Sequence, residues 1–144
     1  MSAARPTVSL RYFCAEHAST LVAPSAKDLP TRVSCTRCGH EHLLHLARIT
    51  SDEGLSGCLG CGERELYARK DFPPALGLAI VVLAACLVPV VPYYASLVAA
   101  ALLDAILYHF APDVVVCYRC GSEHRRFLPR PRHPRFDRTI EERL

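Results

Sequence analysis

The hydrophobic residues of this chain are concentrated in one long run, residues 73–112, whereas the flanking segments mix apolar and polar positions. Residues 75–92 contain no charged side chain, and a helix of that length spans roughly 27 Å at about 1.5 Å per residue. Pro89 and Pro92 fall at its far end, where the chain is expected to reverse. A return helix is predicted over residues 93–110. The pattern therefore predicts a transmembrane helical hairpin.

The charges around this hairpin predict its orientation. Basic residues precede the first helix and follow the second, and the turn between the helices has none; they are Arg64, Arg69, Lys70, Arg119, Arg125 and Arg126. Short loops rich in lysine and arginine stay in the cytoplasm. We therefore expect a protein of the inner (cytoplasmic) membrane, with both termini on the cytoplasmic side. Asp104, inside the second helix, is expected to be protonated or hydrogen-bonded near the cytoplasmic interface, and the alternative is a role in an ion path or an interhelical contact.

The segments outside the hairpin carry cysteines at metal-ligand spacing. Seven of the eight cysteines stand in pairs separated by two residues, or with a histidine at the same separation, and Cys86 is the exception. This spacing favours zinc over disulfides, and reduced thiols are typical of the cytosolic side. Residues 7–13 alternate like a short strand leading into the first pair. The expected fold class is one or more small zinc-ribbon β modules combined with an α-helical transmembrane hairpin, a membrane α+β protein.

The expected domains follow the order of these features. An N-terminal zinc ribbon covers residues 7–50, and a second knuckle with a linker covers residues 51–72. The transmembrane hairpin occupies residues 73–112. A third knuckle at residues 113–124 completes the second zinc site. A basic, proline-rich tail with a short terminal helix covers residues 125–144.

Four ligand pairs can combine into two zinc sites in more than one way. The sequential pairing builds site 1 from Cys14, His17, Cys35 and Cys38, and site 2 from Cys58, Cys61, Cys117 and Cys120. It is favoured because the helices of an antiparallel hairpin end side by side, about 8–10 Å apart, which brings the pairs that flank the hairpin together. The alternative joins the 35/38 pair to the 58/61 pair and leaves the first pair with the last. A glycine expected to adopt a positive φ follows three of the pairs, as Gly39, Gly62 and Gly121, whereas Ala18 follows His17.

The chemistry of the sequence favours binding over catalysis. The formal net charge is +3, and seven thiolates with two zinc ions would bring it near zero, so charge gives no argument for nucleic acid. We find no nucleotide-binding loop, hydrolytic triad or zinc-protease motif. The sequence therefore predicts a membrane-anchored, non-enzymatic module that binds two zinc ions and exposes ribbon surfaces to a protein partner. One alternative is a thiol redox sensor or metal-handling protein that uses a pair such as Cys117 and Cys120. Another is nucleic-acid binding through the ribbon and the basic tail, and small residues along the helices also favour self-association.

Five segments carry a resemblance to a known group: CTRCG, CLGCG, KDFPPALG, CYRCGSEHR and FDRTIEER. The knuckles resemble the broad bacterial zinc-ribbon group. The layout is similar to that of uncharacterised small bacterial membrane proteins, in which a ribbon is followed by a two-helix hairpin and a further knuckle. The resemblance implies zinc and a membrane, and implies no particular activity. His17 stands where a ribbon of this kind usually has cysteine.

Overall fold

The computed structural model describes residues 7–14, 17–89, 94–127 and 133–143. The chain divides into two compact units. The first unit combines Met1–Arg69 with Asp113–Leu144, and the second is Lys70–Pro112. Some predicted features lie outside the described residues: the end of the first helix and the turn at 90–93, and residues 128–132 and 144 of the basic tail.

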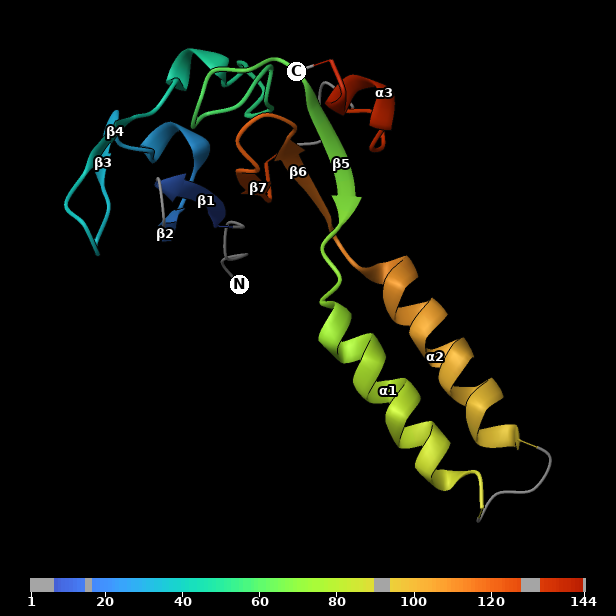
Figure 1. Ribbon diagram of the computed structural model, residues 1–144. Coiled ribbons are helices and arrows are strands. Elements are labelled where there is room, and N and C mark those ends of the chain that lie inside the picture. Colours follow the sequence, from blue (N-terminus) through green and yellow to red (C-terminus); the bar gives the residue numbers. More distant parts are fainter. Residues whose placement is uncertain (1–6, 15–16, 90–93, 128–132, 144) are drawn as a thin grey trace, which may run out of the picture. The chain divides into compact units, whose positions relative to one another are not determined.

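The first unit contains a five-stranded sheet with the order β2-β1-β7-β6-β5 (Figure 1). Its strands are β1 (Val8–Cys14), β2 (His17–Ala23), β5 (Leu66–Lys70), β6 (Asp113–Cys117) and β7 (Glu123–Arg125). β1 pairs antiparallel with β2 along its whole length, from Val8 opposite Ala23 to Cys14 opposite His17. On its other side β1 pairs with β7, so the first strand of the chain lies beside the last.

A second, two-stranded sheet joins β3 (Arg32–Ser34) to β4 (Glu41–Leu43). Three short helices complete the unit: η1 (Ala26–Asp28), η2 (Leu46–Arg48) and α3 (Arg138–Glu141). Ser25 caps η1 by accepting a hydrogen bond from the backbone N–H of Lys27, and Asp137 caps α3 by accepting one from Thr139. Such caps satisfy donors that a helix start leaves without partners.

The core of the first unit lies on one face of β1. Val8, Leu10 and Tyr12 alternate with partly exposed neighbours and are buried, as a strand with one covered face requires. Loop residues from the middle of the chain, Leu55 and Leu59, complete the cluster together with Ala23, Ala26, Leu29, Val33, Leu44, Leu66 and Phe127. Each fully buried leucine contributes about 1.5–3 kcal/mol. The core therefore ties the segment from Leu55 to Leu59, at the 58–61 cysteine pair, to the first strand.

The C-terminal segment returns to the edge of the sheet. The backbone N–H of Ala68 in β5 donates to Pro134 O at 2.8 Å. The Phe136 ring stacks on the Tyr118 ring with centroids 5.5 Å apart, and Tyr67 contacts both rings. The Asp137 N–H donates to the Tyr118 hydroxyl at 2.6 Å. These contacts fix the short helix α3 beside the Cys117/Cys120 pair.

The second unit is a pair of antiparallel helices, α1 (Pro74–Leu87) and α2 (Ala95–Phe110) (Figure 1). With 14 and 16 residues, they are about 21 and 24 Å long, whereas the hydrocarbon core of a bilayer is about 30 Å thick. Among the described residues, no helix is both long and apolar enough to cross a membrane. The predicted transmembrane hairpin and the membrane α+β fold class are therefore wrong. The predicted inner-membrane location with cytoplasmic termini depended on this hairpin and is wrong as well. The architecture is a small α+β fold with two cysteine groups.

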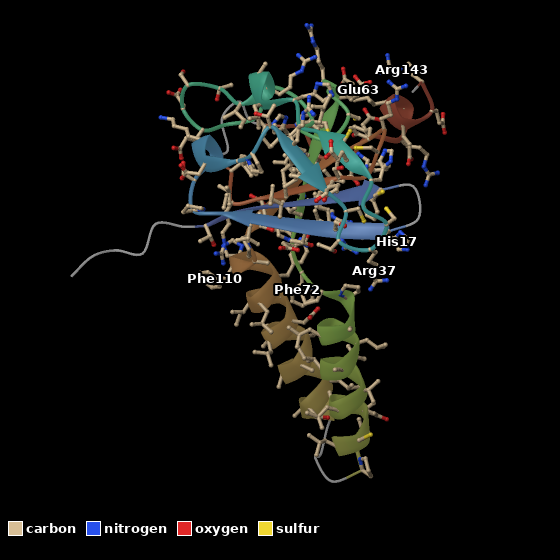
Figure 2. The ribbon with its side chains drawn as sticks, turned by 90° about the vertical axis from the view of Figure 1, so that its left-hand side faces the viewer. His17, Arg37, Glu63, Phe72, Phe110 and Arg143 are labelled. Carbon is tan, nitrogen blue, oxygen red and sulfur yellow. The ribbon has the colours of Figure 1, made fainter. Side chains whose placement is uncertain are left out.

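The open end of this helix pair is held by local contacts. Lys70 Nζ donates to Ala111 O at 2.9 Å, and the Asp71 N–H donates to Pro112 O at 2.8 Å. Figure 2 shows the labelled Phe72 and Phe110 at this end, and the Phe72 ring contacts that of Tyr108. A side chain at Gly77 would meet both Phe72 and Asp104, with its Cβ 3.3 Å from Asp104 Oδ1. The glycine therefore lets α1 approach the carboxylate of α2.

Candidate metal centres

Three cysteine pairs of the described chain adopt the same knuckle. The N–H groups of Gly39, Gly62 and Gly121 donate to the carbonyl of the first cysteine of their own pair, at 2.8, 3.0 and 3.0 Å. The three glycines have φ of +71°, +76° and +68°. Residues with a Cβ rarely adopt this conformation, which explains why the chain places glycine there. The predicted positive φ after these pairs is confirmed.

A four-cysteine group lies at the meeting point of two of these knuckles. The Sγ atoms of Cys58, Cys61, Cys117 and Cys120 all lie within 4.8 Å of one another. Cys58 Sγ is 3.5 Å from Cys120 Sγ, and Cys61 Sγ is 3.6 Å from Cys117 Sγ. Four sulfurs about 2.3 Å from a tetrahedral zinc ion would be about 3.8 Å apart. The group therefore has nearly the dimensions that a tetrahedral metal site requires.

The ionisation of these thiols depends on their mutual contacts. The hydrogen bonds of Cys58 with Cys117 and then Cys120, together with burial, raise the pKa of the Cys58 thiol. Its hydrogen bond with Cys120 and its burial raise the pKa of Cys117 to about 12, although the contact with Cys58 acts in the opposite direction. Hydrogen bonds from Cys117 and Cys58 lower the pKa of Cys120. Ionisation of one thiol disfavours ionisation of its close neighbours, and a bound divalent metal would allow all four to ionise.

The backbone of Leu59 positions the 58–61 knuckle. Its N–H donates to His124 Nε2 at 3.2 Å, and its carbonyl accepts from the His45 N–H at 2.9 Å. His124 Nδ1 lies 3.3 Å from Val115 O, so the proton of a neutral ring is on Nδ1 and Nε2 is the acceptor. Burial lowers the pKa of His124 to about 4, which keeps the ring neutral. His124 therefore connects the knuckle before the helix pair to the strands that follow it.

An ion-pair cluster stands next to His124 in the sheet. The side chain of Glu123 is 8% exposed and lies 2.6 Å from Arg69, 2.8 Å from Arg125 and 3.8 Å from Arg11. These arginines come from β5, β7 and β1. A buried carboxylate is stable only when cations or hydrogen-bond donors compensate its charge. The cluster therefore links three strands of the sheet around one buried charge.

A repeated sequence could have pointed to His124 before the structure was known. Residues 35–42 read CTRCGHEH and residues 117–124 read CYRCGSEH. Each copy forms a knuckle between two antiparallel strands, with Val33 opposite His42 in one and Val115 opposite His124 in the other. In the first copy the His42 ring packs against Tyr12 and His40, and its Nε2 is buried without a hydrogen-bond partner among the residues that the structure describes. The two copies thus share geometry but differ in the contacts of the histidine.

The second group contains three cysteines, Cys14, Cys35 and Cys38. Cys14 Sγ lies 3.3 Å from Cys38 Sγ, and Cys35 Sγ lies 3.4 Å from Ser19 Oγ. The contact with Cys38, followed by burial, raises the pKa of Cys14 to about 11. The hydrogen bond from Ser19, followed by backbone N–H groups of the knuckle, lowers the pKa of Cys35 to about 6. One thiol of this group is therefore poised to ionise first.

His17, the fourth ligand predicted for this group, is not part of it in the described chain. His17 stands directly opposite Cys14 at the end of the β1–β2 pairing. The Cys14/His17 pair thus closes a β-hairpin, whereas the other pairs form glycine-containing knuckles. Figure 2 shows the labelled His17 and Arg37 on the same side of the first unit. Glu16, which precedes His17 in the sequence, lies outside the described residues.

No family model matches this chain, and no curated protein or solved structure matches it either. The resemblance to small zinc-ribbon membrane proteins therefore stays an expectation. The class that the site defines is a protein with two cysteine groups, each able to hold a metal ion.

Proposed function

We propose that this protein is a non-enzymatic module built around two zinc ions, one in each cysteine group. The four-cysteine group carries this proposal, because its sulfur–sulfur distances of 3.5 and 3.6 Å approach those of a tetrahedral zinc site. Four thiolates are a soft donor set that suits zinc and disfavours magnesium or calcium. The four sulfurs would fill the tetrahedron and leave no position for a substrate, which is typical of structural zinc.

The zinc ion in this group would connect segments far apart in the sequence. Cys58 and Cys120 are 62 residues apart, and a crosslink across so long a loop removes several kcal/mol of chain entropy from the unfolded state, about 3–5 kcal/mol on the scale known for disulfides. A unit of this size gains much from such a crosslink, because its hydrophobic core is small. With its structure secured, the module would present the exposed knuckle at residues 36–40 to a protein partner.

Metal content of the purified full chain tests the proposal. The wild-type protein should contain two zinc ions per chain, measured by inductively coupled plasma mass spectrometry against protein concentration. The double variant Cys58→Ser/Cys117→Ser should contain one, since it removes one sulfur from each half of the four-cysteine group.

Cys86→Ser is the matched control, because Cys86 is an exposed thiol in α1 that belongs to neither group. This variant should retain two zinc ions. A double variant that holds as much zinc as the wild type would refute the assignment of the four-cysteine group.

A further inference from the structure

The two cysteine groups differ in the number of donors that they bring together. One group offers four sulfurs within 4.8 Å of one another, and the other offers three. A zinc ion in the first would have a complete tetrahedron. In the second, the residues that the structure describes leave one tetrahedral position to another donor. A metal site with a position not fixed by the protein is the arrangement that permits ligand exchange.

The two cysteine groups also differ in how far their ligands are exposed to solvent. Cys58 and Cys117 are buried, with 0% and 1% exposure, and Leu59 between the ligands is also 0% exposed. In the three-cysteine group Cys38 is exposed, and so are its knuckle neighbours from Thr36 to His40. An incoming ligand must reach the metal before a bound one leaves. Cys14 and Cys35 are buried like Cys58 and Cys117, whereas Cys61 and Cys120 are partly buried. Among the described ligands of the two groups, Cys38 is therefore the exposed one, and an incoming ligand can approach there.

The hydrogen bonds around the ligands differ as well. His124 and His45 hold the backbone of the 58–61 knuckle on both sides of Leu59. His42 occupies the position of His124 in the repeated sequence, yet its Nε2 has no hydrogen-bond partner among the described residues. Groups that orient ligands change metal affinity by about ten- to a hundredfold. The four-cysteine group has this histidine contact, whereas in its counterpart the described contact on a ligand is that of Ser19 Oγ, 3.4 Å from Cys35 Sγ.

We propose that Cys14, Cys35 and Cys38 form an exchangeable site for a zinc-type divalent ion, and that the four-cysteine group holds its ion permanently. This inference rests on the proposed binding of two zinc ions. The fourth position of the exchangeable site takes an external thiol or imidazole donor, and His17 does not hold it permanently. Transfer needs no oxidant: the acceptor donates its lone pairs, the ion leaves with the acceptor, and the three thiolates take up protons from water.

Chelator competition on the zinc-loaded full chain tests this. On addition of excess 4-(2-pyridylazo)resorcinol, the wild type should release one equivalent quickly and one at least about tenfold more slowly. Cys38→Ser should remove the fast phase and keep the slow one, which also reports that the variant is folded.

His17→Ala separates an exchangeable position from a histidine ligand. It should leave the fast equivalent and its rate unchanged. In the cobalt-substituted wild type, added imidazole should shift the visible absorption of one of two bound cobalt ions, and it should do the same in His17→Ala.

Two results would overturn the inference while leaving the proposed function intact. One is release of two equivalents in a single phase, and the other is a changed fast phase in His17→Ala. Fewer than two zinc ions bound before the chelator is added would instead contradict the proposed function.

Discussion

Replacing His124 by asparagine or glutamine separates the two hydrogen bonds of its ring. The amide of asparagine can take the place of Nδ1, which contacts Val115 O, and loses the acceptor for the Leu59 N–H. The longer glutamine can take the place of Nε2 and accept from Leu59. The pair of variants therefore tests which contact secures the 58–61 knuckle, with similar chemistry in both.

The loss of stability expected for each His124 variant follows from the burial of the hydrogen bond that it removes. His124 is 1% exposed and the bond to the Leu59 N–H is buried, so its loss leaves a donor with no partner, at a cost of about 1–3 kcal/mol. Glutamine keeps that bond and loses a net contribution of only about 0.5–1.5 kcal/mol. His124→Asn should therefore be the less stable variant. It should also release zinc from the four-cysteine group faster, because the knuckle that carries Cys58 is no longer held.

The wild type should show a pH dependence that both variants lack. Burial lowers the pKa of His124 from 6.5 to about 4 in the folded protein. Between these values the unfolded chain binds a proton that the folded chain does not. The contribution of neutral His124 to the free energy of unfolding is therefore fully present above pH 6.5 and is lost as the pH falls towards 4. About 2 kcal/mol of it is lost between about pH 8 and pH 5.

Urea unfolding of zinc-loaded protein, followed by circular dichroism at several pH values, measures both effects. Protonation of thiolate ligands also weakens metal binding at low pH, and this loss is common to all three proteins. The difference between wild type and His124→Gln therefore isolates the histidine. Equal stability of the asparagine and glutamine variants, or an equal pH dependence in wild type and glutamine variant, would refute the role given to His124.

Two further substitutions probe the sheet and the helix pair. Glu123→Gln should lower the free energy of unfolding by about 1.5–3 kcal/mol in the same urea experiment, because it removes the charge that pairs with three arginines. The control is Glu41→Gln, since the ion pair of Glu41 with Arg32 is exposed and its atoms are 3.9 Å apart. This control should change the free energy of unfolding by less than about 1 kcal/mol. Equal effects of the two would contradict the burial argument. Replacing residues 73–111 by a short glycine-serine turn should leave two zinc ions per chain. The strands β5 and β6 are neighbours in the sheet, and the Tyr118 N–H donates to Glu65 O at 3.4 Å, so the sheet itself holds the two halves of the four-cysteine group together. Loss of one zinc ion in mass spectrometry would show that the helices are needed to build the site.

The knuckles could be predicted from the sequence because their geometry is local. The two-residue gap and the glycine that follows Cys38, Cys61 and Cys120 determine the turn and its positive φ. The position of His17 depends instead on the register of β1 with β2, which places it opposite Cys14 in a hairpin. Cysteine spacing contains no information about this register.

The helix pair shows a different limit of sequence reasoning. Apolar composition predicts helices over the central run, but it does not fix where they end. α1 ends at Leu87, two residues before Pro89, and the prediction extended it to residue 92 by counting apolar residues through two prolines. Proline removes a backbone donor and disfavours helix in the residue before it. The shorter helix is what makes the transmembrane prediction wrong.

The pairing of β1 with β7 affects the order in which the protein can assemble. Ser9 pairs with Arg125, and Cys58 meets Cys120, so neither the sheet nor the four-cysteine group can be completed before the last part of the chain has been synthesised. At about 5–20 residues per second, the 58–61 pair waits roughly 3–12 s for its partner pair to be made on the ribosome. During that interval its thiols lack the contacts with Cys117 and Cys120. Under the proposed function, zinc capture at this group would therefore be a late event of biogenesis.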